Sequence, residues 1–292
     1  MNVQGRDCCI TLKTPYRAIG LPYAEETIRE AISLLKEEAP IEGAGNCRAI
    51  RKSRGVTGCV VTPLTIETAP LLFVLALGRS GLPVFVSGTR NLYRHSIRLS
   101  AMEMGLRFDL IQERGSLRTL YEGCSVRDFE LRILRDEAIK LKLDIAGDIA
   151  PATYLYQDSL TMDDGERAFC ERFKEDGVQY RINGAENKTI YGLTIAGRKQ
   201  EGTQMEVWIH RILDTAGELP TSIESLEIQA HLFRDSYEWR SYGAFYLTLT
   251  RLVLMADETN VDSGDAVIGP LRYYVTGTVS AEVFTTDEGI IE

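Results

Sequence analysis

The chain has 292 residues, of which 44% are hydrophobic and 26% are charged, and its formal net charge is −9 at pH 7. This composition is that of a globular protein with one large domain or two smaller ones, and the negative charge argues against a nucleic-acid binder that neutralises phosphates. The longest apolar run, 69–77, is nine residues long, whereas a membrane-spanning helix needs roughly 20. Because the N-terminus also lacks the apolar core of a signal peptide, we expect a protein without a membrane anchor that is made in the cytoplasm.

The first strongly periodic stretch in chain order predicts a helix over residues 23–39. Its apolar residues recur at three- and four-residue steps while charged residues occupy the other face. The apolar positions are Ala24, Ile28, Ala31, Ile32 and Leu35. Pro22 precedes this stretch and Pro40 ends it, as expected at the two ends of a helix.

The next stretch, 41–58, is rich in glycine and is predicted to be a loop. Four basic residues lie close together in it, namely Arg48, Arg51, Lys52 and Arg54. In an acidic protein, such a stretch can contact an acidic surface of a partner, including another copy of the same chain. The alternative is an ordinary solvated loop.

A short strand at 57–62 is followed by a second predicted helix, 68–77. Thr68 is suited to the N-cap, Pro70 lies in the first turn, and Gly78 ends the helix. The helix is apolar on every side, so we expect it to lie against the sheet and to be covered all round.

The stretch 127–145 has the sharpest pattern in the chain. Apolar and charged residues alternate in two runs, which are separated by the four residues 135–138. Since side chains alternate between the two faces of a strand, this pattern predicts an antiparallel hairpin with one buried and one wet face. Further strands are predicted at 106–110, 120–126, 178–182, 190–196, 205–213, 226–232, 245–249 and 271–283.

Two local signals refine this picture. Asn183-Gly184 is a turn dipeptide that predicts a tight hairpin, and Gly277, within the last strand, predicts a bulge or a close approach of another backbone. A polar connection is expected at 151–176. The chain is therefore predicted to be mainly antiparallel β, with an N-terminal β region at 1–150 that contains the helices near 23–39 and 68–77. The C-terminal β region, 151–292, either completes or duplicates it.

Motifs for phosphate loops, dinucleotide sites and nucleophile elbows are absent from the sequence. Of the three histidines, His210 and His231 lie inside strand patterns, which favours a role on the sheet surface. A pair formed by Cys124 and His95 is conceivable, but no neighbouring residue would activate the thiol. The six cysteines are expected to be buried free thiols. They are Cys8, Cys9, Cys47, Cys59, Cys124 and Cys170.

Carboxylate pairs occur at Asp163-Asp164 and at Asp262 and Asp265. Neither pair follows a known ligand spacing for a divalent cation. We therefore predict no catalytic, cofactor-binding or metal-binding residue, and a protein that is not an enzyme.

Three stretches resemble a family of tail tube proteins of tailed bacteriophages. Residues 58–78 are similar to a strand and the apolar helix that follows it in that family. Residues 120–133 are similar to a family strand that begins with an aromatic residue and glycine and continues with alternating residues. Residues 262–277 are similar to the closing strand of the family. The resemblance covers most of 55–150 and 225–285 and consists of pattern rather than invariant motifs.

The resemblance implies an antiparallel β-sandwich or barrel with a flanking helix, and a structural function without catalysis or cofactor. Subunits of that family form rings, which stack into a tube through which DNA leaves the capsid. Here a ring would contain six subunits, or three with duplicated domains, within the virion tail and beside other tail proteins. The negative charge fits such a tube, because an acidic lumen lets double-stranded DNA pass without specific binding.

Two other functions are considered. A tube protein of a contractile injection or type VI secretion-like machine belongs to the same mechanical class. A carbohydrate- or peptide-binding β-sandwich would instead expose aromatic side chains. The candidate set for such a site is Tyr237, Trp239, Tyr242, Tyr246, Tyr273 and Tyr274.

Overall fold

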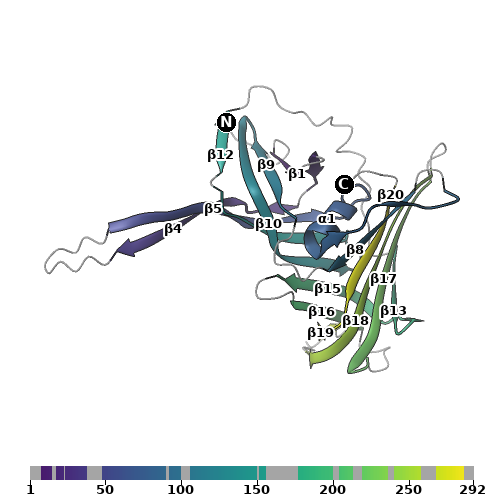
Figure 1. Cartoon of the computed structure of the whole chain (residues 1–292). Coiled ribbons are helices and arrows are strands. Elements are labelled where there is room, and N and C mark those ends of the chain that lie inside the picture. Colours follow the sequence, from purple (N-terminus) through teal and green to yellow (C-terminus); the bar gives the residue numbers. More distant parts are fainter. Residues whose placement is uncertain are drawn as a thin grey trace.

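The computed structural model describes residues 8–14, 18–22, 24–37, 48–89, 92–99, 106–149, 151–155, 177–199, 204–212, 219–235, 240–257 and 268–285. These residues form twenty β-strands and one α-helix (Figure 1). Their strands pair antiparallel in both sheets. The predicted mainly β class is therefore confirmed.

A small sheet contains five strands. Its order is β2 (Ala18–Leu21), β1 (Cys8–Lys13), β9 (Phe108–Arg114), the first half of β10 (Leu117–Leu134) and β12 (Ala152–Leu155). The predicted connection 151–176 thus begins with a paired strand. Its residues 156–176, which include Asp163-Asp164, lie outside the described residues.

The large sheet is open, and it runs from one half of the sequence into the other. Its order along one branch is β3 (Glu25–Glu26) and β4 (Arg29–Glu37), β5 (Arg48–Pro63), β11 (Lys140–Gly147), the second half of β10, β15 (Ile190–Arg198), β16 (Gln204–Ile212), β19 (Ile268–Val275), β18 (Arg240–Asp257), β17 (Ser222–Asp235), β13 (Val178–Ile182) and β14 (Ala185–Glu186). From β18 a second branch continues through β20 (Val279–Thr285) and β8 (Tyr93–Leu99) to β6 (Gly78–Ser80) and β7 (Val84–Phe85).

The strand β10 belongs to both sheets. Its residues 117–124 pair with β9 in the small sheet, and its residues 125–134 pair with β11 and β15 in the large one. The change of sheet coincides with Gly123, whose φ of 63° favours glycine. A register shift between Tyr121 and Cys124 accompanies it, so the bend is a β-bulge.

The predicted hairpin at 127–145 is confirmed. Phe129 pairs with Leu143 and Leu131 with Leu141, and all four side chains are buried. The turn dipeptide is confirmed as well, since Asn183 and Gly184 have φ values of 52° and 79°, as a type I′ turn requires.

The last predicted strand is interrupted at Gly277. The structure contains two strands, β19 and β20, which lie end to end along one edge of β18. Alternation continues across the break, because Tyr273, Val275, Val279 and Ala281 are all buried. A Cβ atom on Gly277 would lie 2.3 Å from the carbonyl oxygen of Thr250, which confirms the predicted close approach. The large sheet divides into its two branches at this point.

The helix α1 (Ala69–Leu77) fits the prediction for 68–77. All nine of its side chains are buried. It contacts β8, β10, β6 and β20, and the ring of Phe73 lies 5.3 Å from that of Phe245 on β18. Thr68 occupies the N-cap, although its hydroxyl bonds to the Thr65 hydroxyl at 2.9 Å rather than to the helix. Gly78, with φ of 102°, forms the C-cap.

The helix predicted at 23–39 is wrong. Residues 29–37 form strand β4, which pairs with β5 from Arg29 opposite Thr57 to Glu37 opposite Arg48. Ile32, expected on the buried face of a helix, is 48% exposed. The local apolar spacing fits a helix, but backbone hydrogen bonds to a distant strand override such a weak local preference.

The loop predicted at 41–58 is wrong for residues 48–58, which belong to β5. Residues 41–47 lie outside the described part of the chain. Gly55 has a structural reason, because a Cβ atom there would lie 2.4 Å from the carbonyl oxygen of Gly147 on β11. The absence of a side chain at Gly55 lets β5 pass close to β11.

Candidate functional site

Two features of the described structure are candidates for function: a projecting arm and an open groove. We call the arm the part of the β4–β5 hairpin at 31–37 and 48–55. The strand β5 pairs with β11 only from Val56 onward, so in the described residues the two strands of the arm pair with each other alone. Figure 1 shows the arm extending away from the body of the protein.

The arm carries the basic residues noted in the sequence. From Arg48 to Arg54 there are four basic residues and no acidic one. Arg54 forms an ion pair with Glu30, and its Nη2 donates to Glu30 Oε2 at 2.8 Å. At the base of the arm, Glu26 accepts a hydrogen bond from the Ile28 N–H at 2.6 Å and one from Arg114 Nη2 at 2.8 Å. This carboxylate, with a side chain only 8% exposed, fixes the base of the arm to the small sheet.

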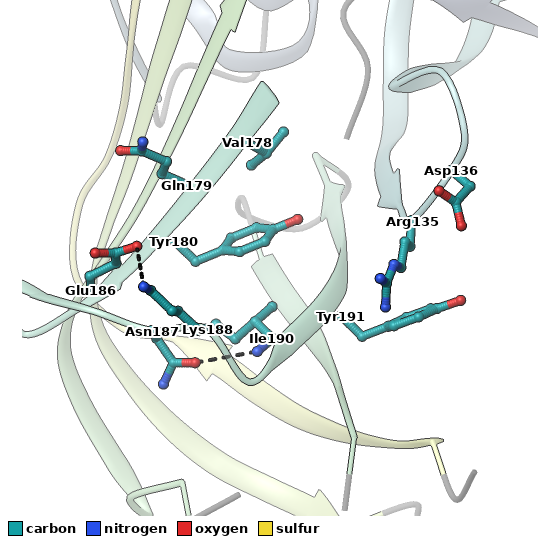
Figure 2. A pocket seen from close by; sticks show the side chains of 10 residues that line it. All are labelled: Arg135, Asp136, Val178, Gln179, Tyr180, Glu186, Asn187, Lys188, Ile190 and Tyr191. Carbon is teal, nitrogen blue, oxygen red and sulfur yellow. Dashed lines mark hydrogen bonds and ion pairs between the residues drawn. The ribbon is translucent and has the colours of Figure 1, made fainter. Parts of the chain in front are cut away.

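The groove, of about 410 Å³, lies beside the β10–β11 turn and the β13–β14 hairpin (Figure 2). Arg135 and Tyr191 line one side of it, with the guanidinium carbon 5.6 Å from the ring centre, as in a cation–π contact. Glu186 and Lys188 lie on the other side, with Lys188 Nζ 3.9 Å from Glu186 Oε1. The remaining lining residues are Asp136, Val178, Gln179, Tyr180, Asn187 and Ile190.

The polar side chains of the groove include some with partners in the protein and some that face solvent. The Oδ1 atom of Asn187 is already used, since it accepts from the Thr189 N–H at 3.0 Å and the Thr189 hydroxyl at 2.9 Å. Lys188 and Glu186 are 83% and 56% exposed, so water screens their charges. The ten lining residues include no histidine, cysteine or serine.

Cys124 and His95, the pair considered in the sequence, each have a different hydrogen-bond partner. Cys124 is buried, and its thiol donates to the Tyr121 carbonyl at 3.4 Å. Burial, reinforced by Asp109, raises the pKa of this thiol to about 12, so it is protonated at neutral pH. His95 is buried on β8 with Nε2 3.3 Å from the Thr285 hydroxyl, so it lies inside the protein.

The other two histidines lie on the sheet surface, as predicted. Val207 and Ile209 are buried on one face of β16, and His210 lies on the other face. Its Nε2 atom is 3.4 Å from the Thr194 hydroxyl. The ring of His231 packs 5.4 Å from that of Tyr246. Burial lowers the pKa of both imidazoles.

The remaining cysteines agree in part with the prediction. Cys9 is buried, with Sγ 4.0 Å from the Thr11 hydroxyl, whereas Cys59 is half-buried, with Sγ 3.4 Å from the Thr27 hydroxyl. Cys47 and Cys170 lie outside the described residues, as does the side chain of Cys8.

The aromatic residues considered for a carbohydrate or peptide site point in different directions. Tyr273 is fully buried and donates its hydroxyl to the Pro220 carbonyl at 2.9 Å. Tyr246 packs between His231 and Phe284 on the opposite face of the large sheet. Tyr274 shares that face. Tyr237 and Trp239, and the side chain of Tyr242, lie outside the described residues.

Within the ranges given above, no three side chains of His, Cys, Asp or Glu gather as a metal site would need. The acidic pair Asp262 and Asp265 lies outside those ranges. The helix of the described chain is too short to cross a membrane.

Asp128 and Asp144 face each other across strands on the wet face of the predicted hairpin. Burial raises the pKa of Asp144, the nearby charge of Asp128 raises it further, and Lys142, with Nζ 3.6 Å away, lowers it. A carboxyl whose pKa is raised by folding binds more protons in the folded state. Its contribution to stability is therefore present in acid and is lost as the pH rises above its ordinary pKa.

We expect Asp128→Asn to lower the pKa of Asp144 and Lys142→Met to raise it, because the first removes a like charge and the second an opposite one. The measurement is an NMR titration of the Asp144 carboxyl carbon in the two variants and the wild type. Shifts of the same sign in both variants would contradict this account of the face.

Sequence reasoning missed the groove and the exposed apolar residues at 82–85, which carry the run Leu82-Pro83-Val84-Phe85. The only signal for the exposed residues was a short apolar run that contains proline and lies between polar stretches. Such a run is equally typical of a buried turn. Neither a protein-family model nor a curated protein sequence matches this chain.

Proposed function

We propose that this protein is a structural subunit that assembles with its own copies into stacked rings, as a tail tube protein of a tailed bacteriophage does. The subunit would be an antiparallel β-sandwich or barrel of the tail-tube type with one flanking helix. Rings of six copies, or of three copies with duplicated domains, would enclose a lumen for double-stranded DNA in the virion tail. The protein would act with other tail proteins and would catalyse no reaction.

The projecting arm is the observation that carries this proposal. A two-stranded hairpin is marginally stable in water, and a third strand or a packed surface normally supports it. Here 31–37 and 48–55 have paired backbones yet extend from the body. An arm of this kind is stabilised when it packs on a neighbouring molecule, and a second copy is always at hand in an assembly.

The distribution of charge agrees with a second copy as the neighbour. The β5 strand of the arm is basic between Arg48 and Arg54, whereas the whole chain carries a net charge of −9. A basic arm and an acidic body attract each other between molecules. The acidic body also fits a conduit for DNA, since it repels phosphates rather than holding them.

We expect the purified protein to form rings or tubes at high concentration. A variant in which a Gly-Ser connection replaces 31–55 should remain monomeric, because the arm is its main contact with the next copy. Electron microscopy and light scattering measure the two forms. Since exposed charges contribute, raising the salt concentration from about 0.1 M to 1 M should weaken assembly of the wild type.

The control is the double variant Arg51→Gln and Lys52→Gln, which keeps the arm but removes two of its charges. It should assemble more weakly than the wild type at low salt and equally at high salt. A wild-type protein that elutes as a compact monomer at high concentration would overturn the proposed function.

A further inference from the structure

One charged side chain reaches into the apolar surroundings of α1. Lys199, the residue that follows β15, donates a hydrogen bond from Nζ to the carbonyl oxygen of Leu75 at 2.7 Å. Its backbone N–H donates to the Arg127 carbonyl of β10 at 3.0 Å. The backbone of Lys199 is thus fixed to the large sheet, while its amine is bonded to the last turn of the helix.

The amine satisfies a carbonyl that the helix itself leaves without a partner. The last four carbonyls of a helix have no partner within it, and the last turn of α1 contains no basic residue. Gly78 donates its N–H to the Val74 carbonyl, and Lys199 donates to the next carbonyl, that of Leu75. The helix dipole also favours a cation at this end.

The same contact buries a charge. The nine side chains of α1 are apolar and buried, and among the described residues the amine of Lys199 has no carboxylate partner. An ammonium group has three N–H donors, and burying it without an opposite charge is unfavourable. Burial accordingly lowers the pKa of Lys199 to about 8.

Other charged groups near Lys199 do not share its position. Arg198 and Asp128 are opposite each other in the pairing of β15 with β10, and they lie on the other face of the sheet because successive side chains of a strand alternate. Arg127 is exposed. On β8, which also contacts α1, the titratable His95 is buried. The amine of Lys199 is therefore the charged group that meets this end of the helix.

The helix α1 connects the two branches of the large sheet. It contacts β8, β6 and β20, which belong to the second branch, and β10, which belongs to the first. A displacement of α1 therefore changes how the branches are held together.

We propose that Lys199 makes α1 a movable wedge between the branches: its buried ammonium group favours displacement of the helix, and loss of the positive charge favours the seated helix. The ammonium group regains its hydration when α1 leaves, whereas a neutral amine keeps the bond to Leu75 without this cost. This inference goes beyond the proposed function, because it concerns a single subunit and does not depend on assembly.

The direction of the pH dependence follows from the lowered pKa. With the helix seated, Lys199 binds fewer protons than it does in water, where its ordinary pKa is 10.5. The burial penalty is fully present below about pH 8 and is relieved as the pH rises from about 8 to 10.5. The seated helix is therefore more stable in mildly alkaline solution than at neutral pH.

Hydrogen–deuterium exchange of the α1 amides, corrected for the intrinsic effect of pH, tests the proposal. Protection in the wild type should rise roughly tenfold between about pH 7 and pH 9. Lys199→Met keeps an unbranched side chain without the charge, so it should increase protection at neutral pH by roughly tenfold or more and remove the pH dependence. Lys199→Arg stays charged over this range and should gain no protection at the higher pH.

The matched control is Lys188→Met, because the Lys188 side chain is 83% exposed. It should exchange as the wild type does at both pH values. Lower protection in Lys199→Met would overturn the proposal, since the bond to Leu75 would then hold the helix in place. Equal protection of the wild type at the two pH values, or a pH dependence that persists in Lys199→Met, would also overturn it.

Discussion

Replacing Gly277 with alanine is expected to destabilise the protein by about 3 kcal/mol. The added Cβ atom would lie 2.3 Å from both the carbonyl oxygen and the hydroxyl oxygen of Thr250. Neither can retreat cheaply, because Thr250 accepts from the Gly277 N–H at 3.1 Å and from the Thr278 N–H at 2.7 Å. The clash would separate β18 from the β19–β20 edge where the two branches meet.

Urea unfolding of Gly277→Ala beside the wild type measures this effect. The control is Gly81→Ala, since a Cβ atom there meets only the Ser96 carbonyl oxygen, at 3.8 Å, and the variant should unfold near the wild-type midpoint. Equal midpoints for Gly277→Ala and the wild type would show that the branch point adapts more easily than the packing indicates.

Phe245→Ala is expected to reduce the free energy of unfolding by about 3–5 kcal/mol, because it leaves a cavity in the core. Phe245 is fully buried on β18 and faces Phe73 of α1 at 5.3 Å between ring centres. All nine residues of the helix are apolar and buried, so it has no polar face that could be exposed to water instead. Loss of its aromatic contact therefore weakens the attachment of the whole helix.

Thermal unfolding of dilute protein is a suitable measurement for Phe245→Ala. Phe85→Ala serves as the control, because Phe85 is 48% exposed and its truncation opens no cavity in the core. Similar losses of stability in the two variants would mean that α1 is not anchored through the Phe73–Phe245 contact.

Strand alternation was the reliable signal in this sequence. The hairpin at 127–145 has a buried face and a wet face whose residues are neighbours both in sequence and in space, so a short window contains the information. The same holds for Asn183-Gly184, where the turn geometry follows from the two residues themselves, and for α1, whose cap residues mark both of its ends.

Long-range pairing could not be predicted in this way. Residues 29–37 have the spacing of an amphipathic helix, and only their partner β5 determines that they form a strand. Gly277 signalled a close approach, but not that Thr250 was the neighbour or that the sheet divides there. The groove brings Arg135 of the β10–β11 turn beside Tyr191 of β15, and the exposed apolar residues of β18 depend on the irregular backbone at Arg251.

The shared strand β10 has a consequence for how the molecule comes apart. The first half of β10 pairs within the small sheet, and its second half lies between β11 and β15 in the large sheet. Separation of the first half from the small sheet therefore also weakens the strand pairing of the second half. Neighbouring regions that share one continuous backbone element tend to open as a single cooperative unit. A force applied to the small sheet is thus transmitted by covalent bonds into the middle of the large sheet.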